Sequence, residues 1–163
     1  YGKSKLAGEK AALTHHASMI IRTSWLYSSF GTNFVKTILK KAREKGSLNV
    51  VFDQTGTPTY AADLAETVMI IVSGVIRNQL AYIAGIYHYS NEGVCSWYDF
   101  ALEIVTESSI DCQVFPVLSD QYPMAAPRPP YSVLDKSRIK ENYEIEIPHW
   151  RSSLQRCLKL LNN

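Results

Sequence analysis

The sequence lacks the glycine-rich loop with which a protein backbone approaches a dinucleotide. It holds eight glycines in 163 residues, but neither Gly-x-Gly-x-x-Gly nor Gly-x-x-Gly-x-x-Gly occurs. In dinucleotide-binding folds such glycines let the backbone and a helix N-terminus reach the pyrophosphate. The 163 residues therefore contain no phosphate loop of this kind for a dinucleotide.

Cysteine is also scarce, and its spacing fits neither a disulfide framework nor a metal site. Cys95, Cys112 and Cys157 are an odd number with no Cys-x-x-Cys pair. This usage favours reduced thiols in a cytoplasmic protein. His15 and His16 have no further His or Cys at metal-ligand spacing, so we interpret them as a polar helix end and expect no metal.

Long apolar runs and concentrated charge are missing as well. The longest apolar run, near residues 68–72, is too short to cross a bilayer, and no signal peptide is visible. The net charge is only +2, and basic residues are dispersed apart from a run at 40–45 that we interpret as a solvated helix end. We therefore expect neither a membrane nor a nucleic-acid partner.

What is present is a pattern of alternating strands and helices. With 46% hydrophobic residues, the chain can form one globular α/β unit over residues 1–163. Periodicity and capping residues predict strands at 19–24, 48–52, 85–90 and 114–117, and helices at 1–15, 33–45, 61–76, 96–107 and from Pro148 onward. A helical turn is expected within 135–142, and irregular loops at 53–59 and 119–133. Because ligands bind at the carboxyl ends of parallel strands, residues 22–27 should lie near a ligand.

The first five residues carry a proton-transfer pattern. Tyr1 and Lys5 are four residues apart and would share one face of a helix. A neighbouring ammonium favours the phenolate and lowers the pKa of the tyrosine. Taken alone, the spacing favours a solvent-facing helix pair without a catalytic role.

Several motifs in a fixed order give the pattern a context. Besides residues 1–9 they include Asp53-Gln54-Thr55-Gly56-Thr57-Pro58-Thr59 and Arg128-Pro129-Pro130-Tyr131-Ser132-Val133-Leu134-Asp135. The others lie at 22–27, 33–34, 63–65, 85–88 and 96–101. Together they resemble the dTDP-4-dehydrorhamnose reductase family of extended short-chain dehydrogenases/reductases, over nearly the whole chain.

This resemblance implies the C-terminal part of an NAD(P)-binding Rossmann-like fold with its substrate-binding subdomain. It implies that about 120 residues of a dinucleotide-binding half would precede Tyr1. A parent protein of this family would reduce the 4-keto group of dTDP-4-dehydro-L-rhamnose with NADPH or NADH. We expect the 163-residue chain to bind a nucleotide-sugar at most and to be inactive alone.

The resemblance also assigns roles to individual residues. Tyr1 would be the general acid, while Lys5 would lower its pKa and bond the nicotinamide ribose. Trp25 would lie along the sugar, where a flat apolar face suits a deoxysugar. Arg22 could instead be a structural arginine at the end of its strand.

The remaining assignments concern the nucleotide part of the substrate. Asn33 would contact substrate, serve as a helix N-cap, or do both. Gln54 would lie in a loop that borders the nucleotide, in which Gly56 would allow a positive φ. Arg128 would bind the diphosphate bidentately. Ser96 and its neighbours are explained by helix capping and core packing.

Two other functions stay open at this point. A non-catalytic regulatory or binding subunit can keep the same fold, and a related nucleotide-sugar epimerase or dehydratase shares many of its features. A partial sheet would also leave strand edges unpaired, which favours a homo-oligomer.

Overall fold

The computed structural model describes residues 2–121 and 128–162. The helices are α1 (Gly2–Ala12), α2 (Phe34–Glu44), α3 (Ala61–Ile76), α4 (Trp97–Glu107), α5 (Ser137–Tyr143) and α6 (Trp150–Asn162), with a 3-10 turn, η1, at Ser119–Gln121. The strands are β1 (Met19–Thr23), β2 (Leu26–Tyr27), β3 (Ser47–Val51), β4 (Thr55–Gly56), β5 (Thr59–Tyr60), β6 (Gly85–Tyr89), β7 (Cys95–Ser96) and β8 (Gln113–Val117). This confirms the mixed α/β class.

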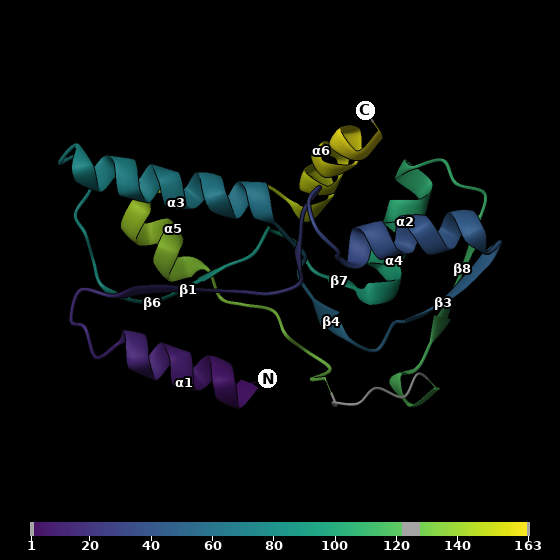
Figure 1. Cartoon of the computed structure of the whole chain (residues 1–163), viewed down its shortest axis with the longest axis horizontal. Coiled ribbons are helices and arrows are strands. Elements are labelled where there is room, and N and C mark those ends of the chain that lie inside the picture. Colours follow the sequence, from purple (N-terminus) through teal and green to yellow (C-terminus); the bar gives the residue numbers. More distant parts are fainter. Residues whose placement is uncertain (1, 122–127, 163) are drawn as a thin grey trace.

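These elements form two lobes, which Figure 1 shows side by side. In the first lobe β1 and β6 pair in parallel, from Met19 opposite Gly85 to Thr23 opposite Tyr89, with α1, α3 and α5 around them. In the second lobe β3 and β8 pair in parallel beside α2, α4 and α6. Two-residue pairs, β2 with β5 and β4 with β7, lie where the chain passes between the lobes.

Each lobe has its own apolar core. In the second, α2 turns Val35, Ile38, Leu39 and Ala42 inward at helical spacing, and these residues pack against α4 and its buried Phe100. A separate cluster joins β6, α3 and α5 in the first lobe. Complete burial of a side chain such as Phe100 contributes roughly 1.5–3 kcal/mol.

A buried polar cluster joins the two lobes. Asp63, on the first turn of α3, is only 2% exposed and accepts hydrogen bonds from Asn91 Nδ2 at 2.6 Å, from Ser153 Oγ at 2.5 Å and from Arg156. Asn91 Oδ1 also accepts from the backbone N–H of Tyr60 at 2.8 Å. One carboxylate thus connects α3, the end of β6 and α6, and it is paired as a buried charge must be.

The structure corrects three predicted boundaries. The first helix ends at Ala12 rather than residue 15, and the loop at 53–59 contains the short strands β4 and β5. The last helix begins at Trp150 rather than Pro148. The reason is tertiary: the Pro148 carbonyl accepts from the Glu92 N–H, and Glu92 forms a parallel bridge with His149, so the chain stays extended until that point.

None of the helices in residues 2–121 and 128–162 is long and apolar enough to cross a membrane. The same ranges hold no group of three His, Cys, Asp or Glu side chains that could bind a metal ion.

Candidate functional site

Two tryptophans form a stack that packs against the core of the second lobe. The rings of Trp25 and Trp97 lie 3.6 Å apart, centroid to centroid, and only 10° from parallel. Trp25 follows the carboxyl end of β1 and has a φ of 48°, a left-handed conformation that is uncommon for a bulky residue. Strained backbone of this kind is often found at functional sites, so the position favours a site role for Trp25.

Gly56 allows the stack to form, but for a different reason from the predicted one. Its φ is not positive, so the loop does not use the positive φ that a glycine would allow. A Cβ at this position would lie 2.7 Å from the indole of Trp25 and 2.6 Å from Ser132 Oγ, closer than real Cβ contacts. Gly56 is therefore required by the close approach of a ring and a hydroxyl to its backbone.

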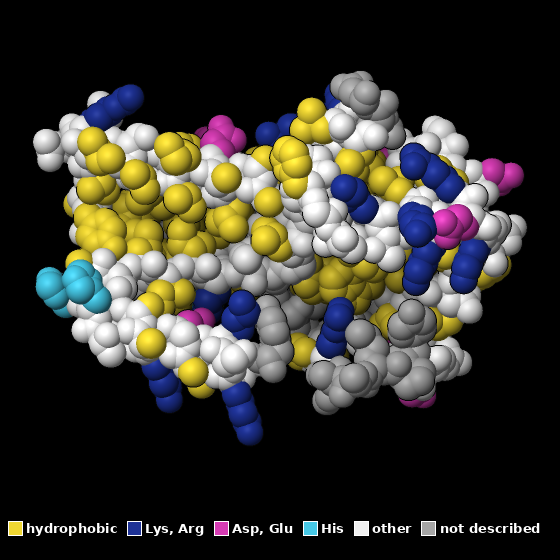
Figure 2. Space-filling model, viewed as in Figure 1, with side chains coloured by type: hydrophobic (Ala, Val, Ile, Leu, Met, Phe, Trp, Pro, Cys, Tyr) yellow, Lys and Arg dark blue, Asp and Glu magenta, His cyan; other side chains and the backbone are white. Residues whose placement is uncertain are grey.

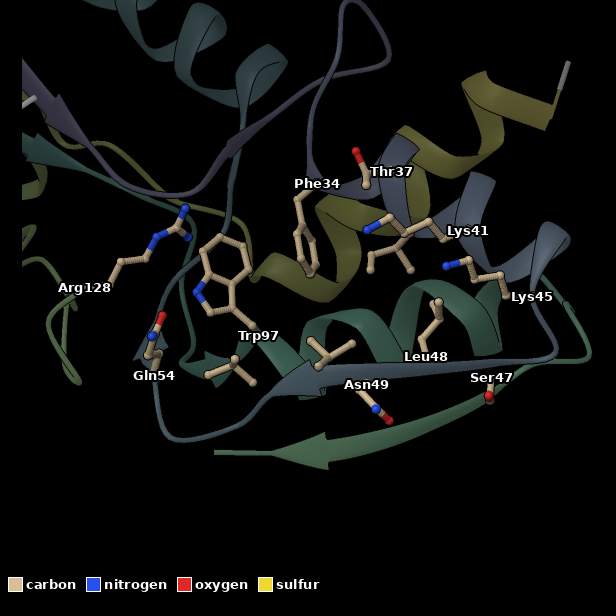
Figure 3. Close-up of a pocket in the computed structure, with 13 residues that line it drawn as sticks. Phe34, Thr37, Lys41, Lys45, Ser47, Leu48, Asn49, Gln54, Trp97 and Arg128 are labelled. Carbon is tan, nitrogen blue, oxygen red and sulfur yellow. The ribbon is translucent and has the colours of Figure 1, made fainter. Parts of the chain in front are cut away.

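Beside the stack lies a pocket of about 460 Å³ between α2 and β3 (Figure 3). Phe34 and Ile38 line it from α2, Leu48 and Val50 from β3, and Trp97 from the start of α4. The remaining described lining residues are Thr37, Lys41, Lys45, Ser47, Asn49, Val51, Gln54 and Arg128. Three of the thirteen are cations and none is a carboxylate, so the pocket suits an anionic ligand with an apolar portion.

Arg128 lies at one end of this pocket. Its guanidinium carbon is 5.7 Å from the centroid of Trp97, within cation–π distance, and Figure 3 shows the group directed toward that ring. The side chain is exposed, and no carboxylate among the described residues pairs with it. A guanidinium held in this way can bind the oxygens of a phosphate group bidentately.

Gln54 lies at the same end and is positioned by a second hydrogen-bonded unit. Its Nε2 donates to Ser119 Oγ at 2.8 Å, and that hydroxyl donates to Asp53 Oδ1 at 2.6 Å. The bond from the Ser119 hydroxyl, with one from its N–H, lowers the pKa of the Asp53 carboxyl. Gln54 is buried, so this chain of bonds orients an amide at the wall of the pocket.

Asn33 uses its side chain to start α2. Its Oδ1 accepts from the Lys36 N–H at 3.2 Å, and its Nδ2 donates to the carbonyls of Ser28 and Phe30. The predicted N-cap is thus confirmed. Asn33 is absent from the described lining of the pocket, so its contact with substrate stays a prediction.

The predicted proton-transfer pair is only partly described. Tyr1 lies outside the described residues. Lys5 lies on the exposed helix α1 and is not among the residues that line the pocket. Arg22, whose role was open, donates to both carboxylate oxygens of Glu9, from Nε at 2.8 Å and Nη2 at 2.6 Å, and so attaches α1 to the end of β1.

The sequence prediction did not assign Lys41, Lys45 or Trp97 to the site. Lys41 and Lys45 fall in the basic run assigned to a solvated helix end, and Trp97 was part of a capping motif. The cap itself is present, because Ser96 and Asp99 bond reciprocally. A helical projection would have shown the two lysines on the face that carries Phe34 and Ile38.

Comparison with known proteins places this geometry in a family. The family described as the RmlD substrate binding domain matches residues 1–163. The chain is 46% identical over 160 residues to the spore coat polysaccharide biosynthesis protein SpsK of Bacillus subtilis (strain 168), covering 98% of this chain and 53% of that protein.

Two solved structures agree over the whole fold. A dTDP-4-dehydrorhamnose reductase from Clostridium acetobutylicum ATCC 824 has a TM-score of 0.89 at 38% identity, covering 100% of this chain and 56% of that one. A dTDP-4-dehydrorhamnose reductase from Bacillus anthracis str. Ames, in complex with NADP, has a TM-score of 0.87 at 38% identity, covering 98% and 54%. The chain therefore spans about half the length of the relatives that it matches.

Proposed function

This chain belongs to the RmlD substrate-binding domain family, and from that premise we propose that its complete gene product is an NAD(P)H-dependent dTDP-4-dehydrorhamnose reductase. The fold is that of the C-terminal part of a Rossmann-like extended short-chain dehydrogenase/reductase. In this proposal residues 1–163 are the substrate-binding portion. The reaction would convert dTDP-4-dehydro-L-rhamnose to dTDP-L-rhamnose.

The observation that carries the proposal is the composition of the pocket. Its described lining combines three cations, no carboxylate, apolar walls from α2 and β3, and Trp97 at the stack. A nucleoside diphosphate joined to a deoxysugar has matching parts: two phosphates, a flat base and an apolar sugar face. In this arrangement Arg128 binds the diphosphate and Gln54 hydrogen-bonds beside it. Trp25, which stacks on Trp97 and does not itself line the pocket, would lie along the sugar, with Asn33 as a further contact.

The chemistry requires a proton donor at the ketone. A bound nicotinamide would supply the hydride to C4 of the sugar. Tyr1 gives its phenolic proton to the oxygen, so that the carbonyl becomes a hydroxyl group. Lys5 stabilises the resulting phenolate by its charge and hydrogen-bonds the ribose of the cofactor.

The described residues offer no glycine-rich cradle for the cofactor's phosphates. We assign that function to the part of the relatives that this chain does not span. A choice between NADH and NADPH would be made there as well. We also propose a cytoplasmic location, in line with the three unpaired cysteines Cys95, Cys112 and Cys157.

The proposal is tested by kinetics on the complete gene product with dTDP-4-dehydro-L-rhamnose and each reduced nicotinamide. We expect turnover, measured as loss of the reduced nicotinamide absorbance and formation of dTDP-L-rhamnose. Tyr1→Phe should lower kcat by about 10²–10⁴-fold, because the proton donor is removed, with a smaller effect on KM.

Residues 1–163 alone serve as the comparison and should show no turnover. Turnover by that piece would contradict the assignment of cofactor binding to other residues. A complete gene product that binds the substrate without reducing it would instead favour a non-catalytic binding subunit.

A further inference from the structure

One wall of the pocket carries two positive charges that have no role in the proposed function so far. Lys41 lies on the face of α2 that also carries Phe34 and Ile38, and Lys45 is the C-cap residue that follows the helix. Figure 3 shows both ammonium groups directed back along the helix, toward Phe34 and Trp97. Helical side chains lean toward the N-terminus, and Lys41 follows that direction.

All three lysines at this helix end are exposed, as expected of a solvated run, but only Lys41 and Lys45 line the pocket. Lys40 pairs with Glu44 at 3.9 Å and takes no part in the described lining of the pocket. Lys41 and Lys45 make no ion pair with any described carboxylate. Two like charges four residues apart are mildly unfavourable on a helix, and a ligand with acceptor atoms would relieve that repulsion.

The position of the lysines along the pocket indicates which part of a ligand they meet. Arg128 lies over Trp97, whose ring is 4.6 Å from that of Phe34 at the start of α2. With a rise of 1.5 Å per residue, the Cα atom of Lys41 lies about 10 Å further along the helix axis. Lys45 follows the last turn of the same helix. A diphosphate held by Arg128 would therefore leave its nucleoside to extend toward the lysines.

We propose that Lys41 and Lys45 bind the carbonyl edge of the pyrimidine base and so select thymine or uracil over cytosine. This inference rests on the proposed function, because it takes the nucleotide part of that substrate as the ligand. An ammonium group can only donate hydrogen bonds. Thymine presents an acceptor at O4, whereas cytosine presents an amino donor at the same position. Leu48 and Val50 supply an apolar floor for either ring.

The test compares dTDP with dCDP, two ligands that differ in the base and share the diphosphate. Titration calorimetry on the complete gene product should show tighter binding of dTDP. In the double variant Lys41→Met, Lys45→Met the affinity for dTDP should fall by about tenfold more than the affinity for dCDP, because a charged hydrogen bond to O4 is lost. The ratio of the two affinities isolates the base from the general loss of positive charge.

Two further variants serve as controls. Lys40→Met removes the same charge from the outer face of α2 and should leave the ratio as in the wild type. Arg128→Met should weaken both ligands by a similar factor. The thermal midpoint of the double variant is compared with that of Lys40→Met, so that a folding defect is recognised.

An equal loss of dTDP and dCDP affinity in the double variant would assign the lysines to the phosphates and overturn the inference. A wild-type protein that reduces the dehydro-sugar but binds both nucleotides equally would overturn it too, with the proposed function intact. A protein that binds neither nucleotide and shows no turnover would refute the proposed function itself.

Discussion

At the scale of single residues, Gly56 decides whether the tryptophan stack can form. The absence of a side chain lets the Trp25 indole and Ser132 Oγ approach its backbone from two directions. Ser132 Oγ is in turn fixed by a 3.1 Å bond to the carbonyl of Thr55. The loop that follows Arg128 is thereby held against β4.

Gly56→Ala should destabilise the complete gene product by about 1–3 kcal/mol, since the added methyl group overpacks the site. Urea denaturation measures the loss, and near-UV circular dichroism should report a displaced indole. Gly46→Ala is the matched control, because a Cβ there meets no atom within 4 Å. Equal stability of the two variants would mean that the stack can move aside at little cost.

At the scale of helices and strands, capping residues in the sequence predicted those helix starts that are set by contacts between near neighbours in the chain. Asn33 caps α2, and Ser96 with Asp99 forms a capping box on α4, so both helices begin within a residue of the expected position. The start of α6 was missed because a bridge between Glu92 and His149, far apart in sequence, sets it.

The features of the site also fall into two groups, those predicted from sequence motifs and those set by tertiary packing. Gln54 and Arg128 were found because their motifs resemble a known family, and they lie at one end of the same pocket. The stack of Trp25 on Trp97 and the approach to Gly56 depend on tertiary packing, which no local pattern encodes. The lysines of α2 were visible in the sequence, but their direction into a pocket was not.

Helix α1 depends strongly on its attachment, since it buries none of its described side chains. The bond from Arg22, strengthened by charge, lowers the pKa of the Glu9 carboxyl. A lowered folded-state pKa means that the contribution is present above the ordinary glutamate pKa. It is lost as the pH falls through the folded value.

We therefore expect Glu9→Gln to increase amide hydrogen exchange in α1 at neutral pH, while amides of α2 keep their protection. In the wild type the protection of α1 relative to α2 should decrease as the pH falls below about 4, where the carboxyl takes up a proton. If α1 exchanges at the same rate in the variant as in the wild type, other contacts hold the helix.

At the scale of the whole molecule, an apolar area remains exposed. Met69, Ile70, Val72 and Ile76 of α3 are 44–75% exposed, and Figure 2 shows hydrophobic side chains gathered over this helix and beside the strands below it. In the described part of the chain β1 pairs with β6 alone, so each also has an unpaired edge. Surfaces of both kinds favour association.

We expect residues 1–163, prepared alone, to self-associate in a concentration-dependent manner. The double substitution Met69→Glu, Ile76→Glu should shift the light-scattering mass toward that of one chain, because it places charge on the apolar face. Phe30→Glu is a suitable control, since Phe30 is 83% exposed but lies outside this area. A strictly monomeric wild-type chain at high concentration would refute the expectation.

The cluster around Asp63 has an evolutionary consequence. Its carboxylate serves Asn91, Ser153 and Arg156 at once, and these partners come from distant parts of the chain. Replacing any one of the four residues leaves a buried polar group of another without its hydrogen-bond partner. Neutral drift at these four positions should therefore be epistatic, so that a lineage changes them together or keeps all four.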